Sequence, residues 1–296
     1  MKIVTLTLSP ALDIEYAAAG EIVPGLNRTS SHAVSAGGKG INVSRSILRC
    51  TAREGRADFA LRTVAPTGGR MGELFLSILR DEGIEVRAVP VRENTRTNVS
   101  LIPPTGKPLE INAPGTPVGD ALGEIESAVL DGIGEGDCVV IAGSCPRDVP
   151  KSYPAELIAK VKKTGAAAVL DCDGEALRIA VKAEVKPDLI KPNDEELAAL
   201  TGCDPEDEGE LRRAAESLGI SEVITTRGAK GSMLTSAAWG GKTVFFPTEA
   251  KKVVRLKGAG DTFLGAFVYA KYVRQDPPEW CMETAAIAAG QYVAGE

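Results

Sequence analysis

Short apolar runs alternate with longer amphipathic segments along most of this chain, and this alternation limits its possible folds more than any other feature. The runs predicted as buried strands are residues 2–8, 58–65, 137–142, 167–171, 188–190 and 222–226. Helical patterns occupy residues 40–53, 70–82, 119–131, 150–163, 174–182, 193–200 and 206–218. Because parallel strands are joined by helices that cover the sheet, we predict an α/β fold, a three-layer αβα sandwich with a mostly parallel central sheet.

Four more polar runs interrupt the alternation, at residues 13–18, 28–35, 97–103 and 107–113. Turn sequences such as Pro24-Gly25 and Pro104-Thr105-Gly106 separate them, as is typical of exposed hairpins. They fall in two insertions, at about residues 12–36 and 96–114. We expect both insertions to meet in one small β-sheet lid over the carboxyl edge of the main sheet. The whole chain, residues 1–296, is predicted to be a single domain.

Charge and composition exclude several classes of function. The net charge is −6 without a basic block, which argues against a nucleic-acid partner. The apolar start of the chain is too short for a signal peptide or a membrane span, so we expect a cytoplasmic protein with no membrane contact. Six cysteines without a C-x-x-C pair and a single histidine, His32, argue against a zinc site and a Ser-His-Asp triad. An anionic ligand would have to be held by a few local cations.

The run Lys257-Gly258-Ala259-Gly260-Asp261-Thr262-Phe263 carries the clearest chemical signal. Its glycines free backbone N–H groups to face an anion at the start of a helix, and a carboxylate follows at once. Asp261 could act as a base there, or could simply cap the helix. The run is not a dinucleotide fingerprint, because Phe263 stands where that motif needs its third small residue.

Three weaker motifs each have a structural alternative. Residues 35–43 join glycines, Lys39 and Asn42 before a helix, but Gly40 excludes a P-loop, which needs Ser or Thr there. Asn193 and Glu196 could hold a hydrated Mg²⁺ on one helical turn, or only begin that helix. The run from Thr226 through Gly228 to Gly231 could line a ligand, or form an ordinary turn between two strands.

These motifs, in this order, resemble the ribokinase-like (PfkB) carbohydrate kinases. The chain is most similar to the branch of 1-phosphofructokinases and tagatose-6-phosphate kinases. The residues that carry this likeness are 6–13, 36–43, 95–98, 110–115, 142–146 and 189–193, reading LTLSPALD, AGGKGINV, TRTN, EINAPG, AGSCP and LIKPN. The match extends from residue 2 to about residue 294 and implies a ribokinase-like fold.

The resemblance also implies a reaction and a role for each motif. Asp261 would take the proton of the attacking hydroxyl, and the N–H groups of Gly258, Ala259 and Gly260 would stabilise the transferring phosphoryl group. Asp13, Gly38 and Asn42 would bind sugar hydroxyls, with Lys39 and Arg96 on the phosphate of the substrate. Nucleotide contacts would come from Lys191, Thr226, Gly228, Gly231 and Gly260. Asn193 and Glu196 would hold Mg²⁺ through water, ATP would be the donor, and the lid would form a homodimer contact. Lys257 has no counterpart in the family pattern.

The leading expectation is ATP-dependent conversion of fructose 1-phosphate to fructose 1,6-bisphosphate. Tagatose 6-phosphate and fructose 6-phosphate stay open as substrates, because the same cations can hold a phosphate at either end of the sugar. A non-catalytic sugar-phosphate sensor on the same fold is the alternative from another class. A nicotinamide dehydrogenase would fit the alternation but lacks the fingerprint.

Overall fold

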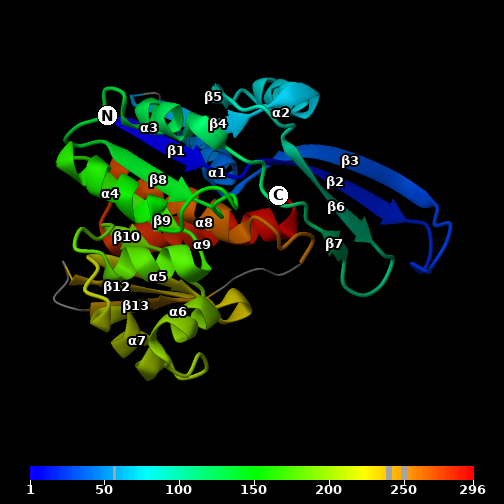
Figure 1. Cartoon of the computed structure of the whole chain (residues 1–296). Helices are drawn as coiled ribbons and strands as arrows, with labels where there is room; N and C mark the ends of the chain where they lie inside the picture. The colour runs from blue at the N-terminus through cyan, green and yellow to red at the C-terminus, as the bar shows by residue number, and fades with distance from the viewer. Residues whose placement is uncertain (56–57, 238–241, 248–252) are drawn as a thin grey trace.

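A computed structural model describes residues 1–55, 58–237, 242–247 and 253–296 of the chain (Figure 1). Within these residues the central sheet has nine strands in the order β13-β12-β11-β10-β9-β8-β1-β4-β5. In chain order they are β1 (Lys2–Thr7), β4 (Ala60–Thr67), β5 (Val86–Pro90), β8 (Cys138–Ala142), β9 (Ala167–Asp171), β10 (Leu189–Ile190), β11 (Glu222–Thr226), β12 (Ser232–Ser236) and β13 (Lys242–Phe246).

The predicted mostly parallel sheet is confirmed. All pairings from β5 across to β11 are parallel, whereas β12 and β13 add an antiparallel edge. The six predicted strands are present; β5 and β13 were not predicted, and β12 was implied only by the turn expected after residue 226. The sequence signal fails at β12 (SMLTS) because all five residues are buried, although only Met233 and Leu234 are apolar. This segment is a strand because it is buried between its neighbours, and burial cannot be predicted from so short a run of mostly polar residues.

Helices cover both faces of the central sheet. One face packs on α1 (Lys39–Glu54), α8 (Ala259–Val268), the π-helical turn η4 (Tyr269–Arg274) and α9 (Pro278–Ala294). The other face carries α3 (Leu122–Leu130), α4 (Tyr153–Lys163), α5 (Gly174–Lys182), α6 (Asp194–Thr201) and α7 (Glu208–Ser217). Successive side chains of a strand point to opposite faces of the sheet. Ile3 therefore packs against the layer of α1, α8 and α9, and Val4 against the layer of α3 to α7. The three-layer sandwich is thereby confirmed.

Helix ends differ slightly from the predicted ranges. The helix expected at residues 119–131 begins with the 3₁₀ turn η1 (Gly119–Ala121) before α3, and the helix expected at 150–163 begins only at Tyr153. Helix α2 (Gly69–Asp81) packs near the base of the smaller sheet, where Phe75 and Leu79 contact Leu12 and Ala36. The last short element, η2 (Gly228–Lys230), forms the turn between β11 and β12, as predicted.

The two predicted insertions form one four-stranded sheet, the lid sheet, in the order β3-β2-β6-β7. Its strands are β2 (Ala11–Ala18), β3 (Thr29–Gly37), β6 (Arg96–Ile102) and β7 (Leu109–Ile111). The lid sheet extends as an arm from the body of the molecule (Figure 1). Strand β2 follows β1 after only three residues, 8–10, so the arm starts at the carboxyl edge of the central sheet.

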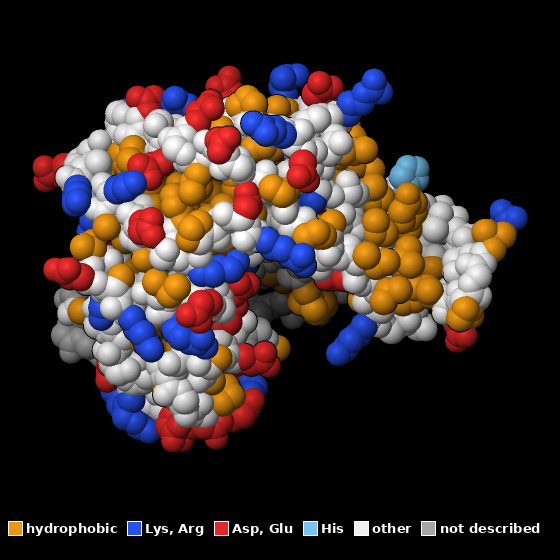
Figure 2. Space-filling model, viewed as in Figure 1, with side chains coloured by type: hydrophobic (Ala, Val, Ile, Leu, Met, Phe, Trp, Pro, Cys, Tyr) orange, Lys and Arg blue, Asp and Glu red, His pale blue; other side chains and the backbone are white. Residues whose placement is uncertain are grey.

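The two faces of the lid sheet differ in polarity. Asp13 lies level with Ser35 of β3 and Asn98 of β6, whereas the next position, Ile14, lies level with Val34 and Val99. One face is therefore polar and the other apolar. Figure 2 shows hydrophobic side chains gathered over the arm, beyond the hollow that separates it from the body.

Among the described residues, no helix is both long and apolar enough to cross a membrane. The six cysteines are all free thiols, four of them buried.

Candidate active site

Asp261 lies in the first turn of α8, at the carboxyl edge of the central sheet, and is only 9% exposed. It does not cap the helix: the N-cap is Gly258, whose φ of 91° lies in the left-handed region that glycine adopts without strain. The capping alternative is therefore wrong. The carboxylate points instead toward α1, where Asn42 Nδ2 donates a hydrogen bond to Asp261 Oδ2 over 2.7 Å.

The start of α8 offers free backbone donors for an anion. The predicted donors were Gly258, Ala259 and Gly260, but Ala259 N–H donates to Leu256 O over 3.1 Å in a tight turn. Within the described residues the N–H groups of Gly258, Gly260 and Asp261 have no protein acceptor. We call these three donors the anion hole. They stand at the positive end of the helix dipole, which favours a bound anion.

The surroundings of Asp261 change its acidity. Burial raises the pKa of this carboxyl, and the charge of Asp171 raises it further. The Asn42 hydrogen bond and the ammonium groups of Lys191 and Lys39 act in the opposite direction, but the pKa stays above that of an ordinary aspartate. A carboxylate of raised pKa that faces free anion donors has the properties of a general base.

Asp171 gathers two lysines beside Asp261. It ends β9 and is 2% exposed; Lys39 Nζ lies 3.4 Å from its Oδ1 and Lys191 Nζ lies 3.4 Å from its Oδ2. Burial opposes the charge of Lys39, but the carboxylates of Asp171, Asp261 and their neighbours outweigh it and raise the pKa of Lys39. Lys39 therefore stays protonated at neutral pH, and Asp171 holds both ammonium groups in place.

Lys191 also reaches the anion hole. A methyl group placed on Gly260 would lie 3.3 Å from Lys191 Nζ, so this ammonium packs directly over the first turn of α8. Gly260 thus keeps the space between the helix start and the cation open. The fold thus brings together two of the five predicted nucleotide contacts, Lys191 and Gly260.

Asp13 lies on the polar face of the lid sheet and meets three other residues. Asn98 Nδ2 donates to its Oδ1 over 2.8 Å, and Lys257 Nζ lies 3.4 Å from the same oxygen. A methyl group on Gly37 would lie 2.1 Å from Asp13 Oδ2, so any larger residue there would displace the Asp13 carboxylate. Lys257, which the sequence left unexplained, therefore joins the catalytic turn to the lid sheet.

Arg96 begins β6 and is held by main-chain oxygens rather than by a carboxylate. Its Nη1 donates to Ala113 O over 2.8 Å and its Nη2 to Ser9 O over 3.1 Å. Its Nε is buried without a partner, and within the described residues the guanidinium forms no ion pair. Burial lowers the pKa of Arg96, and Asp13 partly restores it. A held guanidinium with a donor to spare suits a phosphate.

Asn193 and Glu196 form a capping box at the start of α6. Glu196 N–H donates to Asn193 Oδ1 over 2.7 Å, and Asn193 N–H donates to Glu196 Oε2 over 2.8 Å. The structural alternative is thus present, and it uses one oxygen of each side chain. Glu196 Oε1 accepts no hydrogen bond in the described part of the chain, which leaves one carboxylate oxygen for a metal-bound water. No cluster of three potential metal ligands occurs there either.

The predicted turn after β11 adjoins this cap. Thr226 N–H donates to Pro192 O over 3.1 Å, and Thr226 pairs with Asn193 in an isolated bridge. Gly228 begins η2 and Gly231 follows it, both with positive φ. Gly231 has its own structural reason, because a methyl group there would lie 2.2 Å from Phe246 O. Gly228 meets no such obstacle, so its positive φ alone favours glycine.

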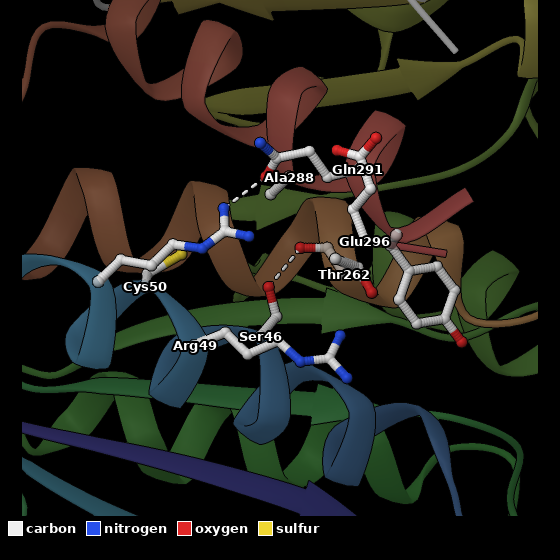
Figure 3. Close-up of a pocket in the computed structure, with 9 residues that line it drawn as sticks. Ser46, Arg49, Cys50, Thr262, Ala288, Gln291 and Glu296 are labelled. Atoms are coloured by element: carbon white, nitrogen blue, oxygen red, sulfur yellow. Dashed lines mark hydrogen bonds between the residues drawn. The ribbon is translucent and has the colours of Figure 1, made fainter. Parts of the chain in front are cut away.

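Helices α1 and α9 support α8 from behind. Ser46 Oγ donates to Thr262 O over 2.6 Å, and a methyl group on Gly265 would lie 2.5 Å from Ser46 Cβ. Figure 3 shows the small pocket where α1, α8 and α9 meet, with Ser46 and Thr262 joined across it. Tyr292 OH donates to Lys257 O over 2.8 Å, just ahead of the anion hole. The pocket lies behind the catalytic turn, so its residues brace the site rather than line it.

Sequence reasoning missed three side chains that organise the site: Asp171, Asn98 and Arg45. Asp171 could have been found, because it ends a predicted strand at the sheet edge where ligands bind in α/β folds. Asn98 lies inside a quoted motif, and its role depends on β6 pairing with β2. Arg45 follows Asn42 by one helical turn, and nothing in the sequence shows that the two side chains touch.

A buried carboxylate, three free backbone donors and two lysines at the carboxyl edge of an αβα sandwich are features of a phosphotransferase with an alcohol group as acceptor. Comparison with known proteins agrees: a family model described as "pfkB family carbohydrate kinase" matches residues 12–295. The chain therefore belongs to the pfkB family of carbohydrate kinases.

Two curated relatives are similar over most of the chain. The 1-phosphofructokinase of Bacillus subtilis (strain 168) is 33% identical over 272 residues, covering 90% of this chain and 84% of the relative. The ATP-dependent 6-phosphofructokinase isozyme 2 of Escherichia coli (strain K12) is 31% identical, with the same coverage of 90% and 84%.

Solved structures agree on the fold. The phosphofructokinase-2 from Escherichia coli in complex with substrates and products has a TM-score of 0.89 at 28% identity, covering 99% of this chain and 94% of that one. The Arabidopsis thaliana ribokinase complexed with ribose and ATP has a TM-score of 0.74 at 27% identity, covering 98% and 92%. The ribokinase-like fold is confirmed.

Proposed function

We propose that this chain transfers the γ-phosphoryl group of ATP to a hydroxyl of fructose 1-phosphate, with fructose 1,6-bisphosphate as the product. The observation that carries the proposal is the placement of Asp261 beside the anion hole, with Asn42 on its Oδ2. Asp261 takes the proton of the attacking hydroxyl as the new O–P bond forms and the bond to ADP breaks. A general base of this kind contributes about 10²–10⁴ in rate.

The anion hole stabilises the charge on the phosphoryl group during transfer. Each such backbone donor is worth about 3–4 kcal/mol in comparable oxyanion sites. Lys191, which packs over Gly260, adds a positive charge on the nucleotide side. Thr226, Gly228 and Gly231 would line the site for the nucleotide, on the side of its adenine base and ribose. The chemistry is one of position and electrostatics rather than covalent catalysis.

Arg96 supports a substrate that already carries a phosphate. A guanidinium that is partly buried, uses main-chain oxygens for its position and has no carboxylate partner in the described residues is ready for an anion. Lys39 is proposed as the second cation that binds this phosphate, although in this structure its ammonium forms an ion pair with Asp171. Asp13, Gly38 and Asn42 would bind the sugar hydroxyls on the polar face of the lid sheet.

Mg²⁺ fits the site only through water. Asn193 Oδ1 and Glu196 Oε2 are occupied by the capping box, so the remaining Glu196 Oε1 would hold a metal-bound water. When bound with ATP, Mg²⁺ neutralises charge on the phosphate oxygens. The protein groups described above supply the remaining steps.

The apolar face of the lid sheet supports a homodimer. Val34, Ile14, Val99 and Ile111 form one row across all four strands. Val34 is 40% exposed and Ile111 is 57% exposed. An exposed apolar row of this extent is typical of an interaction surface. We propose that two copies of the chain bury this face against each other.

A substrate panel tests the proposal. ADP release would be measured with fructose 1-phosphate, fructose 6-phosphate and tagatose 6-phosphate, and the position of the new phosphate read by NMR. We expect the highest kcat/KM with fructose 1-phosphate. A higher value with fructose 6-phosphate or tagatose 6-phosphate would change the substrate. No ADP release with any of them, despite measurable binding, would overturn the proposed function.

A further inference from the structure

Arg45 lies one turn after Asn42 on α1 and donates four hydrogen bonds to three residues. Its Nη1 donates to Asn42 Oδ1 over 2.8 Å, and its Nη2 donates to Ala36 O over 2.6 Å. The carboxylate of Glu82, at the end of α2, accepts two further hydrogen bonds. Arg45 Nε donates to its Oε2 over 2.6 Å, and Nη2 donates to its Oε1 over 3.0 Å. The Arg45 side chain is 18% exposed, and these four hydrogen bonds orient its guanidinium.

These contacts decide which way the Asn42 amide faces. An amide carries one oxygen acceptor and one nitrogen donor, and exchange of the two would reverse both contacts. Arginine can only donate, so it must face the amide oxygen. The amide nitrogen is then directed at Asp261 Oδ2, 2.7 Å away. Without Arg45 the amide oxygen loses its donor, so only the bond to Asp261 holds the amide and its position is less fixed.

We propose that Arg45 is a positioning residue of the phosphoryl transfer, which sets the Asn42 amide and through it the orientation of the Asp261 carboxylate. The inference rests on the proposed function, since it needs Asp261 to be the base. Glu82 anchors the arginine to α2, and the Arg45 bond to Ala36 O fixes the end of β3, where the sugar-binding glycines begin. The chain of contacts runs from Glu82 through Arg45 and Asn42 to Asp261.

The proposal makes a kinetic prediction that a purely structural role does not. With Asn42 Nδ2 held on Oδ2, the other carboxylate oxygen is left to face the substrate hydroxyl. A misplaced reacting group costs up to about 100-fold in rate. Arg45→Met should therefore lower kcat by about 10- to 100-fold. The KM for ATP should change little, because Lys191 and the β11–β12 turn do not contact Arg45.

The pH profile of kcat/KM gives a second readout. The groups that face Asp261 are Asn42 from α1, Lys39 at the start of α1, Asp171 from β9 and Lys191 after β10. Of these, only the Asn42 bond depends on Arg45. Since that bond lowers the pKa of Asp261, its weakening in Arg45→Met should move the acidic limb to higher pH. Free guanidinium at millimolar concentration should restore part of the rate to Arg45→Ala.

A double-mutant cycle tests the route through Asn42. If Arg45 acts through this amide, Asn42→Ala combined with Arg45→Met should lose no more in kcat than Asn42→Ala alone. Losses that multiply would overturn the inference, as would an Arg45→Met enzyme with unchanged kcat and pH profile. Arg87→Met is the matched control, because it removes an arginine whose Nη1 lies 2.6 Å from Asp131, away from the site; it should leave both readouts unchanged.

Glu82→Gln keeps the inference testable if Arg45→Met fails to fold. It keeps an oxygen acceptor for Arg45 but removes the charge, so the same shift of the acidic limb should appear at smaller size; no shift would count against the proposal. Asp261→Asn separates this inference from the proposed function. Turnover that survives Asp261→Asn would refute the base itself, whereas an inactive Asp261→Asn enzyme with a normal Arg45→Met profile would refute only the role of Arg45.

Discussion

Lys257 crosses from the start of α8 to the lid sheet, where its Nζ lies 3.4 Å from Oδ1 of Asp13. The lysine side chain is 52% exposed, whereas Asp13 is 17% exposed. The same Asp13 oxygen accepts a hydrogen bond from Asn98. The ion pair thus joins the residue that precedes the anion hole to the carboxylate proposed to bind the sugar. Lid and catalytic turn are linked at this point.

Lys257→Met should weaken binding of the sugar phosphate. The substitution removes the cation that orients Asp13, and it removes a positive charge beside a negatively charged ligand, so both effects raise KM. We expect a several-fold increase in the KM for the sugar phosphate and a smaller change in kcat. Stability should change by less than about 1 kcal/mol, because the pair is largely solvated. Steady-state kinetics with a thermal melt check both, and an unchanged or lower KM would contradict the role.

Asp261→Asn should lower kcat by about 10²–10⁴ while sugar-phosphate binding is retained. In the wild-type enzyme, kcat/KM should fall as the pH drops through the raised pKa of Asp261, above the value of about 3.9 for a free aspartate. Direct binding by calorimetry separates loss of the base from loss of the site. Turnover within a few-fold of the wild type would refute Asp261 as the base.

The same substitution should stabilise the fold at neutral pH. Burial raises the folded-state pKa of Asp261, so the folded state prefers the protonated form. The stability that this preference contributes is complete below the unfolded pKa and is lost as pH rises through the folded pKa. At neutral pH the ionised carboxylate is therefore a cost that asparagine removes. The melting temperature of Asp261→Asn should exceed that of the wild type at pH 7, and the difference should shrink in acid.

The fold was largely predictable, because burial patterns with periods of two and 3.6 residues record which faces are covered. Strands such as β8, all of whose residues are buried, leave a strong signal in the sequence. Strand β12 does not, because its serines and threonine are polar and still buried. The lid sheet was found from its turns, but its parallel pairing of β2 with β6 depends on a contact between distant segments.

The candidate site could be predicted only where a run of residues forms a distinctive chemical pattern. Asp261 and its glycines stand out, whereas Arg45 and Glu82 resemble ordinary surface charges until the helices are packed. The Ala259 N–H illustrates a further limit: its bond to Leu256 O arises from the geometry of one turn, which residue identity does not determine. Side-chain partners and turn hydrogen bonds therefore have to come from the three-dimensional structure.

Asp171→Asn should destabilise the protein and shift the pH profile in the direction opposite to Arg45→Met. The substitution leaves Lys39 and Lys191 without the carboxylate that lies 3.4 Å from each. Removing one partner of a buried ion pair costs about 3–5 kcal/mol. Because the charge of Asp171 raises the pKa of Asp261, after the larger effect of burial, its loss should move the acidic limb to lower pH. Denaturant unfolding and kcat/KM against pH are the measurements. A limb that stays in place would contradict the assigned coupling.

Val34→Glu should convert the proposed homodimer to a monomer. Val34 lies on the apolar face of the lid sheet, level with Ile14, and is 40% exposed, so a charge there is tolerated by the single chain. Buried against a second copy, the same charge would be desolvated without a partner, at a cost of several kcal/mol. Ser31→Glu is the control, since Ser31 lies level with Ala17 on the opposite face of the same strand. Sedimentation velocity should show a dimer for the wild type and Ser31→Glu and a monomer for Val34→Glu. A Val34→Glu chain that stays dimeric would place the interface elsewhere, because an apolar contact centred on this row cannot accommodate two buried carboxylates.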